Sequence, residues 1–459
     1  MSEIEDIVAR ARMAQAAYEA EGSQTRYDRA AEAAAWAIME PGRNRELAEL
    51  AVATTGLGNV PDKMIKNHRK TLGLMRDIQG AVTYGVISDD PETGITEIAR
   101  PKGVVGAIVP STNPAATPAN NIINALKCGN AIVVAPSPKG VACSERLIGF
   151  IRAEFEKIGE NLDLVQMIPA PGSKEKTQAL MELCDMIVAT GSQNNVHRAQ
   201  TAGTPAVAVG AGNVTVIVDE TADLADAAEK IRASKCFDNA TSCSSENAVV
   251  VVDAVHDAFI AAMGRAGGAL VEDEAGLVEK LWPGGHLNRS VIAQDADKMI
   301  AALGLDLPEE TDYIAVPTSG IGPEHPLSGE KLSRVLALYR AADFAAALQT
   351  TKEIQVHQGA GHSVGIHTED QTRPMELATA IPTSRVIVNQ AHTFATGGSF
   401  TNGMPFSLSM GCGTWGGNSV NENVNYRHFL QSTKIVREIP AREPSLDEIF
   451  SDYWAEAGR

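Results

Sequence analysis

From about residue 103 onward, short apolar runs rich in β-branched residues alternate with segments of helical periodicity. Nearly continuous apolar runs are typical of strands buried on both faces of a parallel sheet. Parallel strands need crossover connections, so helices are expected on both faces. The predicted strands are 103–110, 131–136, 164–169, 186–190, 206–210 and 214–219, then 248–253, 313–318, 335–340, 363–368 and 385–390. The pattern predicts an α/β fold with two doubly wound units.

The chain outside these two units has a different texture. Residues 2–88 show apolar positions at helical spacing with a break near Thr54–Asn59, and Ser2 and Glu5 are spaced as a capping box. Residues 397–425 are rich in glycine and asparagine, and a strand-like tail follows at 433–440. We therefore expect a helical N-terminal segment and a return of the chain near its end.

Charge and cysteine spacing limit the function. The chain has 39 Lys and Arg residues against 57 Asp and Glu residues, a net charge of −18, with no basic run. This argues against nucleic-acid and anionic-membrane binding. The six cysteines form no CxxC pair and no metal-ligand spacing with histidine, so we expect no metal site. No apolar run has membrane or signal-peptide length, and we expect a cytoplasmic protein.

Cys243 is the candidate nucleophile. It lies among small polar residues in FDNATSCSSEN, between a predicted helix that ends near Lys235 and a strand that begins at Ala248. A thiolate exposed at such a junction can attack an aldehyde carbonyl and form a thiohemiacetal. An idle or buried thiol is the alternative that the residues alone leave open.

Asn113 is the candidate oxyanion partner. It follows a predicted strand in VPSTNPAATPANN, and Pro114 disfavours a helical conformation at Asn113. Its amide would then lie at the carboxyl end of a strand, where α/β proteins place ligands. An N–H group there can donate to a developing oxyanion. A turn asparagine that bonds its own backbone is the alternative.

Two glycine-containing junctions are candidate cofactor sites. Thr190, Gly191 and Ser192 begin TGSQNN, which follows a predicted strand and precedes a helix, a setting that suits pyrophosphate at a helix N-terminus. Gly210 and Gly212 in GAGN either bring the backbone close to a nicotinamide or form a tight turn.

Two titratable residues lie in loops of small residues. Glu330 in HPLSGEKLS can accept hydrogen bonds from ribose hydroxyls, or it is a solvated surface carboxylate. His362 in GAGHS can transfer protons if it faces the cleft, or it is a structural histidine.

Four stretches together resemble the aldehyde dehydrogenase superfamily and its coenzyme A-acylating branch: TAGTPAVAVGAGNVTVIVDETAD, CFDNATSCSSENAVVVVD, HPLSGEKLS and GCGTWGGNSVNENV. The resemblance spans about residues 100–430. It implies that Cys243 is the nucleophile and that Asn113 and the Cys243 N–H form the oxyanion hole. It also implies that Glu330 holds the nicotinamide ribose, that Thr190–Ser192 line the pyrophosphate and that His362 assists proton transfer.

The resemblance also implies a division of the chain and an assembly. Residues 1–90 are expected to be N-terminal helices of the cofactor domain, 91–102 part of an oligomerisation arm, and 103–219 the dinucleotide-binding Rossmann-like domain. Residues 220–416 are expected to form the catalytic domain, and 417–459 to return to the cofactor domain and end in an oligomerisation tail. A homodimer or homotetramer is expected.

One departure from the hydrolytic members bears on the product. Those members carry a glutamate about one strand before the cysteine, in an E-L-G-G-K-type motif, as the base that activates water. Here the stretch reads AVAVGAGN, the matching place falls near Val209, and no carboxylate lies between Thr201 and Val218. A positioned base is typically worth about 10²–10⁴-fold. Because coenzyme A brings its own thiol, the missing glutamate predicts transfer of the acyl group to coenzyme A.

A second departure bears on the cofactor. Hydrolytic relatives usually read K-P-S-E after the second core strand, with the glutamate on the adenosine ribose. This chain reads Ala135-Pro136-Ser137-Pro138-Lys139, without that acid. A glutamate would repel a 2′-phosphate, whereas Lys139 can pair with it. Ser137 and Lys139 are therefore cofactor candidates, with NADP⁺ and NAD⁺ both open.

The sequence leaves more than one substrate and more than one reaction class open. The resemblance favours sulfoacetaldehyde, and the hydroxyls and amides near Cys243 suit a small polar aldehyde; acetaldehyde, propionaldehyde and succinate semialdehyde stay open. Arg427 and His428 are candidates for contacting an anionic end group. The competing classes are a hydrolytic aldehyde dehydrogenase, an enzyme similar to γ-glutamyl-phosphate reductase, and an idle nucleotide-binding shell protein.

Overall fold

The computed structural model describes residues 2–459. Four helices open the chain, namely α1 (Glu3–Ala20), α2 (Gln24–Met39), α3 (Pro41–Thr55) and α4 (Val60–Ile78). The capping box of Ser2 and Glu5 is present at the start of α1. The expected break lies between α3 and α4: Gly56 ends α3 in a left-handed conformation (φ 70°), and Asn59 caps α4 by accepting from the N–H of Asp62.

The first sheet has five parallel strands in the order β5-β4-β3-β6-β7. The strands are β3 (Val104–Val109), β4 (Ala131–Pro136), β5 (Val165–Met167), β6 (Met186–Thr190) and β7 (Ala206–Val209), and the helices are α5 (Ala116–Lys127), α6 (Val141–Ile158), α7 (Lys174–Leu183) and α8 (Gln193–Thr201). α2 packs against both α5 and α6, so the N-terminal helices share the core of this sheet.

The second sheet has seven parallel strands in the order β10-β11-β12-β9-β8-β13-β14. The strands are β8 (Val214–Val218), β9 (Glu246–Val252), β10 (Gly268–Leu270), β11 (Tyr313–Pro317), β12 (Val335–Ala341), β13 (Val364–His367) and β14 (Val386–Val388). The helices are α9 (Leu224–Cys236), α10 (His256–Arg265), α11 (Glu274–Leu281), α12 (Ala296–Leu303), α13 (Phe344–His357), α14 (Arg373–Ala380) and α15 (His392–Thr396). One core forms under α9 and α10, and a second on the opposite face under α11 to α14.

The boundary between the two α/β units differs from the expected one. We placed the strand at 214–219 in the first unit, but β8 pairs with β9 and β13 of the second sheet. The chain therefore passes between the sheets at Gly210–Asn213, directly after β7. Both strands are equally apolar, so periodicity could not reveal which sheet each one joins. β10, with only three residues, was not predicted.

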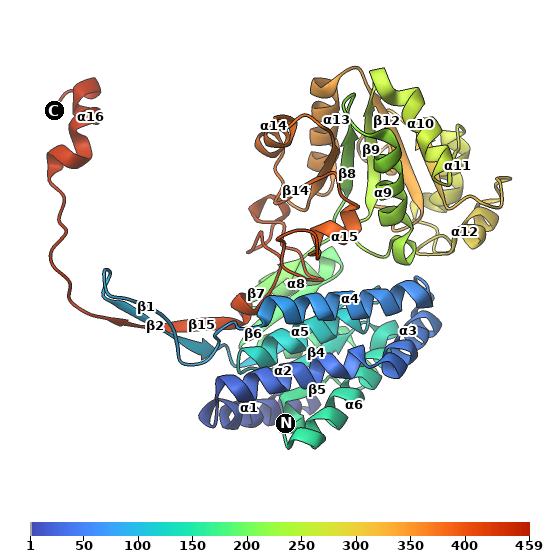
Figure 1. The fold of residues 1–459 in the computed structure, drawn as a ribbon. Coiled ribbons are helices and arrows are strands. Elements are labelled where there is room, and N and C mark those ends of the chain that lie inside the picture. Colours follow the sequence, from blue (N-terminus) through green and yellow to red (C-terminus); the bar gives the residue numbers. More distant parts are fainter. Residues whose placement is uncertain (1) are drawn as a thin grey trace.

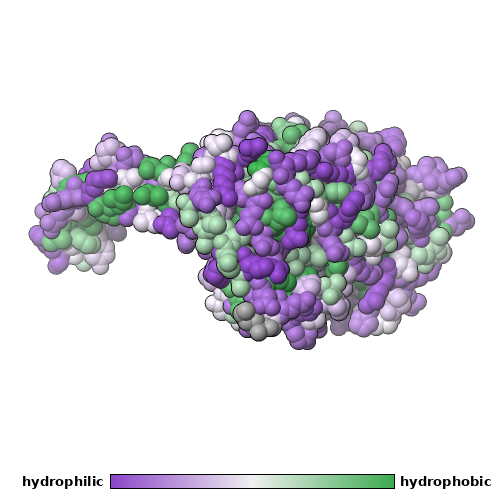
Figure 2. Space-filling view, turned by 90° about the horizontal axis from the view of Figure 1, so that it is seen from below, coloured by the Kyte–Doolittle hydropathy of each residue, from purple (hydrophilic) through white to green (hydrophobic). Residues whose placement is uncertain are grey.

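A third, antiparallel sheet forms an arm away from the body (Figure 1). It consists of β1 (Val86–Asp90), β2 (Ile95–Pro101) and β15 (Leu430–Val436), and β2 lies between the other two. The helix α16 (Leu446–Ala457) lies beyond its far end. The arm begins earlier than the expected 91–102, because β1 pairs with β2 as a hairpin. Figure 2 shows apolar surface on this projecting part.

Short 3₁₀ turns connect several of these elements. They are η1 (Pro138–Gly140), η2 (Leu162–Leu164), η3 (Phe237–Ala240), η4 (Asp253–Val255), η5 (Pro283–Gly285), η6 (Pro326–Ser328), η7 (Thr414–Gly416) and η8 (Tyr426–Phe429). Within residues 2–459, no helix combines the length and the apolar character that crossing a bilayer requires.

Candidate active site

A cavity of about 390 Å³ lies where the two α/β units meet α4. Asn113 enters it from the turn after β3, Cys243 from the turn before β9, and Glu330 from the segment before β12. The α4 helix and the segment 393–410 supply the remaining walls. The predicted site residues that line it are Cys243, Asn113, Thr190, Gly191, Ser192, Gly210 and Glu330. The volume is in the range of small-molecule sites.

The turn that carries Cys243 is unusual in its backbone. Asp238, Asn239 and Ala240 precede it with φ values of 49°, 55° and 60°. Left-handed conformations disfavour residues with a Cβ atom, so three in succession persist only where the surroundings hold them. The side chains of Asp238 and Asn239 are fully buried and hydrogen-bonded. The packing of this segment therefore fixes the approach of the chain to Cys243.

His362 lies against the thiol of Cys243. Its Nε2 is 3.3 Å from Cys243 Sγ, and its Nδ1 is 2.8 Å from the hydroxyl of Ser363. The same hydroxyl lies 2.9 Å from Nε2 of His392, so a buried chain of polar groups extends behind the cysteine. His362 is buried behind the cavity wall and does not line it.

The cysteine and the histidine are both neutral in the ligand-free protein. Burial, followed by the charge of Glu330, raises the pKa of Cys243 to about 12. Burial, followed by the charge of Arg385, lowers the pKa of His362 to about 3. A neutral imidazole keeps one ring nitrogen able to accept a proton. In the ligand-free protein the thiol therefore keeps its proton, and Nε2 of His362 lies beside it as an acceptor.

Gly212 lies directly behind Cys243. A Cβ atom at this position would be 2.5 Å from the Cys243 carbonyl oxygen and 2.9 Å from Cδ2 of His362. Any larger residue would displace one of them. We expected Gly212 next to a nicotinamide, but it does not line the cavity, and its contacts are with the cysteine and the histidine.

The amide of Asn113 is held by its oxygen. Nζ of Lys66 donates to Oδ1 of Asn113 at 2.9 Å and to Oγ1 of Thr241 at 2.9 Å. The Nδ2 group of Asn113 has only a long contact, 3.5 Å, with the hydroxyl of Thr112. The Cys243 backbone N–H donates to no group within residues 2–459. Two donors, the Asn113 amide and the Cys243 N–H, thus have capacity left for a ligand oxygen.

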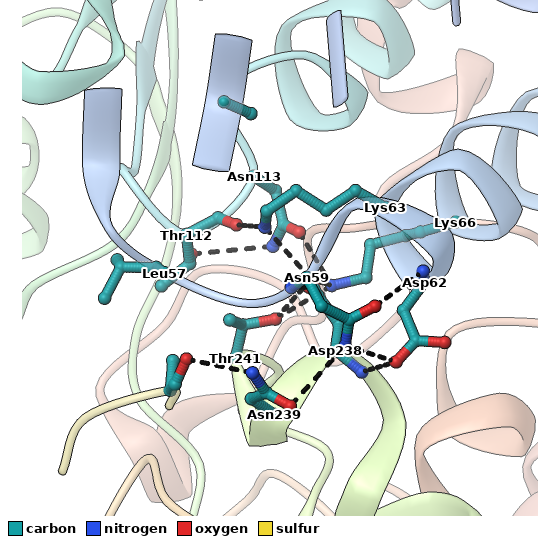
Figure 3. Close-up of polar contacts among 12 residues, drawn as sticks. Leu57, Asn59, Asp62, Lys63, Lys66, Thr112, Asn113, Asp238, Asn239 and Thr241 are labelled. Carbon is teal, nitrogen blue, oxygen red and sulfur yellow. Dashed lines mark hydrogen bonds and ion pairs between the residues drawn. The ribbon is translucent and has the colours of Figure 1, made fainter. Parts of the chain in front are cut away.

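Asp238 joins this turn to α4. Its carboxylate accepts from Lys66 and, at 3.1 Å, from Lys63, which also donates to the carbonyl oxygen of Thr112 at 3.1 Å. Figure 3 shows both lysines reaching from α4 toward the Thr112–Asn113 turn and Asp238. Burial raises the pKa of Asp238, but the charges of Lys66 and Lys63 outweigh it and the net shift is downward. The two α/β units are thereby linked through buried ion pairs.

The opposite part of the cavity fits a nicotinamide cofactor. Gly191 has a φ of 148°, which favours glycine, and Ser192 caps α8, so the N-terminus of this helix faces the cavity. The Glu330 side chain makes no hydrogen bond to any residue in 2–459 and is free to accept from hydroxyls. Burial raises its pKa to about 7.

Two predicted cofactor residues lie outside the cavity. Ser137 and Lys139 fall at the end of β4 and in η1, and neither lines the cavity. Lys139 is exposed to solvent. The hydroxyl of Ser137 is buried and has no hydrogen-bond partner among the described residues. Ser137 and Lys139 therefore lie away from the cavity that holds Cys243, and a cofactor bound there could reach them only with a group distant from its nicotinamide ring.

Sequence reasoning missed the contribution of α4. Lys66, Arg69 and Lys70 line the cavity. The spacing of Lys63, Lys66 and Lys70 places three lysines on one helical face, and this was the available signal. In contrast, Arg427 and His428 do not line the cavity; Arg427 is exposed and lies over the ring of Tyr426.

The place of the hydrolytic glutamate is apolar. Val209 is buried at the end of β7. Among the residues that line the cavity, Glu330 is the only carboxylate. The expectation that no acid lies near Cys243 therefore holds for the 201–218 stretch but not for the whole cavity.

Comparison with known proteins identifies the family. The aldehyde dehydrogenase family profile matches residues 1–275. A sulfoacetaldehyde dehydrogenase (acylating) of Cupriavidus necator is 54% identical over 99% of this chain and 92% of its own length. A crystal structure of an acetylating aldehyde dehydrogenase from Geobacillus thermoglucosidasius superposes with a TM-score of 0.92 at 31% identity, covering 96% of this chain and 98% of that chain.

A second solved structure is a propionaldehyde dehydrogenase from Rhodopseudomonas palustris with bound propionyl-CoA. Its TM-score is 0.84 at 26% identity, and the match covers 95% of this chain and 94% of that chain. The chain belongs to the aldehyde dehydrogenase family, and the α/β fold expected from the sequence is confirmed.

Proposed function

We propose that this protein oxidises sulfoacetaldehyde to its coenzyme A thioester and reduces NAD(P)⁺. The observation that carries the proposal is the contact of Cys243 with His362, 3.3 Å apart, at a cavity where the place of the hydrolytic glutamate is apolar. The names of the relatives, sulfoacetaldehyde dehydrogenase (acylating) and acetylating aldehyde dehydrogenase, support the same chemistry.

In the first half-reaction, Cys243 adds to the aldehyde carbonyl. His362 accepts the thiol proton at Nε2, and the sulfur forms a bond to the carbonyl carbon. The negative charge that develops on the carbonyl oxygen is stabilised by the Asn113 amide and the Cys243 N–H. A nicotinamide cofactor held by Glu330 and Thr190–Ser192 would supply the hydride acceptor for this oxidation. Oxidation of the adduct leaves a thioester on Cys243.

In the second half-reaction, coenzyme A resolves the thioester. Its thiol attacks the acyl carbon, the Cys243–carbon bond breaks, and acyl-CoA leaves. His362 first releases to solvent the proton that it took from Cys243. Its neutral imidazole can then take the proton of the incoming thiol and return it to the departing Cys243 sulfur. The polar chain through Ser363 to His392 fixes the ring orientation during both proton transfers. Asn113 serves the same oxyanion role in this step.

Glu330 is assigned to cofactor binding. Its carboxylate has free acceptor capacity for ribose hydroxyls, and we place Thr190–Ser192 on the pyrophosphate at the N-terminus of α8. The competing function is hydrolysis with Glu330 as the base, because it is the one carboxylate in the cavity wall. That function predicts free acid as the product.

The product separates these two functions. The protein is incubated with sulfoacetaldehyde and NADP⁺ or NAD⁺, with and without coenzyme A, and the products are identified by mass spectrometry. We expect sulfoacetyl-CoA, and no acid at comparable rate when coenzyme A is omitted. Sulfoacetate formed at full rate without coenzyme A would contradict acyl transfer. Cys243→Ala controls for reaction in solution.

We also propose that the protein forms a homodimer or homotetramer, and the projecting arm supports this. Exposed apolar side chains gather on β15 and α16 (Figure 2): Ile435, Val436, Leu446, Ile449, Phe450 and Tyr453. Exposed apolar side chains that gather on projecting elements mark candidate protein–protein contact sites. Light scattering of the full chain and of a variant with Ile449 and Phe450 changed to serine tests this; equal masses in a monomeric state would contradict it. We also propose a cytoplasmic location, because the proposed reaction uses coenzyme A and a nicotinamide cofactor.

A further inference from the structure

Arg69 and Lys70 bring positive charge into the cavity without a carboxylate partner. Both line the cavity that holds Cys243. Within residues 2–459, no Asp or Glu oxygen lies within ion-pair distance of either one. Lys66, the third cation of this wall, differs because Asp238 neutralises it. The α4 wall therefore carries an excess of positive charge.

Lys70 is held by carbonyl oxygens only. Its Nζ donates to the carbonyl of Gly397 at 2.5 Å and to that of Ser407 at 3.1 Å. An ammonium has three N–H donors, so one remains without a protein partner. Burial, followed by the charges of Arg69 and Lys66, lowers the pKa of Lys70 to about 7. A buried charge is costly unless it is paired, and an anion in the cavity would relieve this cost.

Arg69 is fixed on one side and free on the other. Its Nη2 donates to the carbonyls of Phe394 and Gly398 at 2.9 and 3.3 Å, while Nε and Nη1 donate to no described residue. The guanidinium lies over the rings of Phe394 and Phe406, which hold its plane in place. A planar guanidinium with unused N–H groups suits an oxyanion with several acceptor atoms.

A hydroxyl on another residue that lines this cavity is also unpartnered. Thr393 lines the cavity, and its Oγ1 is buried and makes no hydrogen bond to any group in residues 2–459. Thr393 directly precedes Phe394, whose carbonyl holds Arg69. Buried polar atoms normally have a partner, so the unused hydroxyl points to a ligand or water in the complex. Three residues that line the same cavity thus have hydrogen-bond donors left over.

We propose that Arg69 and Lys70, with Thr393, form a subsite that binds the anionic end group of the aldehyde, a sulfonate or a carboxylate. The inference deepens the proposed function and depends on it. One methylene separates the sulfonate from the carbonyl carbon in sulfoacetaldehyde, so both ends must lie in the same cavity when the carbonyl reaches Cys243. The subsite selects against neutral aldehydes, because they leave the two cations unpaired.

The phosphates of the cofactors are the other anions available. The 3′-phosphate of coenzyme A is separated from its thiol by the whole pantetheine arm, and the 2′-phosphate of NADP⁺ is carried by the adenosine ribose. A thiol or a nicotinamide at Cys243 therefore places these groups outside a cavity of about 390 Å³. The pyrophosphate of the nicotinamide cofactor is assigned to Thr190–Ser192 at the N-terminus of α8, so the cations of α4 are left for the substrate.

The test compares anionic and neutral aldehydes within each variant. For wild type, Arg69→Met and Lys70→Met, kcat/KM is measured with sulfoacetaldehyde, succinate semialdehyde and propionaldehyde at saturating coenzyme A and cofactor. We expect the ratio of sulfoacetaldehyde to propionaldehyde to fall about 10- to 100-fold in each variant, the range for hydrogen bonds to charged groups. The ratio for succinate semialdehyde shows whether carboxylates use the same site.

Arg76→Gln is the matched control. Arg76 lies on α4 and donates to the carbonyl of Ser399 at 3.2 Å, but it does not line the cavity. In Arg76→Gln the ratio of kcat/KM for sulfoacetaldehyde to that for propionaldehyde should equal the wild-type ratio. Equal losses for both aldehydes in Arg69→Met and Lys70→Met, or a rise in the KM of coenzyme A or NADP⁺ alone, would overturn the subsite.

A binding measurement on wild type tests the subsite even if the variants fold poorly. In wild type, ethanesulfonate should protect Cys243 from alkylation by iodoacetamide, and ethanol at the same concentration should not. Absence of protection would overturn the subsite. A wild type that forms acyl-CoA only from neutral aldehydes would overturn both the subsite and the proposed substrate, while acyl transfer itself would stand.

Discussion

Nζ of Lys66 donates a hydrogen bond to Oδ1 of Asn113 at 2.9 Å, and the same ammonium contacts the carboxylate of Asp238. An amide has two polar ends, and a cation can engage only the oxygen. The contact therefore turns the N–H₂ end of Asn113 away from Lys66 and leaves it available for the oxyanion role that we propose. Because Asp238 holds Lys66 in turn, the orientation depends on a residue of the second α/β unit.

Replacement of Lys66 should lower turnover without removing the nucleophile. In Lys66→Met the amide of Asn113 loses its orientation, and we expect kcat to fall about 10-fold or more, against the 10²–10³ typical for loss of a whole oxyanion donor. Lys63→Met is the comparison, since Lys63 contacts Asp238 and the carbonyl oxygen of Thr112 but not the side-chain amide of Asn113. Steady-state rates of acyl-CoA formation measure the effect.

A double-mutant cycle with Asn113→Ala gives the decisive readout for Lys66. If Lys66 acts through Asn113, the second substitution adds little once the first is made. Fully additive losses would show that Lys66 acts elsewhere, for example on stability, and thermal unfolding of each variant identifies that case.

The local motif of the site was readable from the sequence, whereas its supporting contacts were not. Cys243 and Asn113 each lie in a short stretch with a strand beside it, and those stretches carried the family resemblance. Lys66 is 47 residues from Asn113 and 175 from Thr241 along the chain, so no local pattern links them. Only the helical spacing of the lysines hinted that one face of α4 turns inward.

Contacts between residues far apart in the chain also explain where the structure departs from our predictions for β8 and Gly212. The strand β8 reads like its neighbours, and its place in the second sheet follows from long-range pairing with β9 and β13. Gly212 was recognised as a special position, but its neighbours, Cys243 and His362, come from segments far along the chain. Polar residues near Cys243 in sequence suggested a polar substrate; the charge that suits an anion comes from α4.

The charge of Glu330 should delay ionisation of the nucleophile. Burial and then Glu330 raise the pKa of Cys243, so Glu330→Gln, which keeps the shape and removes the charge, should lower that pKa. The rate of iodoacetamide alkylation, measured from pH 6 to 10 in the ligand-free protein, should rise at lower pH in the variant. Mass spectrometry locates the label, and Cys243→Ala gives the background from the other thiols. An unchanged profile would mean that Glu330 does not act on the thiol.

His367 should make the protein sensitive to acid. Burial lowers its pKa to about 4, whereas an unfolded histidine titrates near 6.5. Below pH 6.5 the unfolded chain binds a proton that the folded protein does not, so this residue costs stability progressively as the pH falls toward 4. His367→Gln removes the cost. The unfolding free energy of His367→Gln minus that of wild type should rise by about 1.4 kcal/mol for each unit by which the pH falls across this window.

The effect of His367 has to be measured as the difference between wild type and His367→Gln, because other buried groups titrate in the same pH range. Burial also raises the pKa values of Glu246 and Glu330 to about 7, which makes stability fall with rising pH over part of the same range. These groups are present in both proteins, so they cancel in the difference. Urea unfolding at pH 7.5, 6.5, 5.5 and 4.5 measures it. A difference that does not change with pH would show that His367 is not neutral in the folded protein.

Lys139 should decide between the two cofactors. It is exposed in η1 after β4, outside the cavity, so the nicotinamide end is unaffected and only a distant group such as the 2′-phosphate can reach it. Lys139→Ala should raise the KM for NADP⁺ by up to about 10-fold, the low end for a hydrogen bond to a charged group because solvent screens an exposed lysine, with little change for NAD⁺. Lys139→Glu should widen the gap, because a carboxylate repels the 2′-phosphate and can accept from the hydroxyls of NAD⁺. Lys157→Ala, at the other end of α6, controls for general loss of surface charge. Equal effects on both cofactors would remove Lys139 from cofactor selection, since a neutral ribose offers the lysine no charge to recognise.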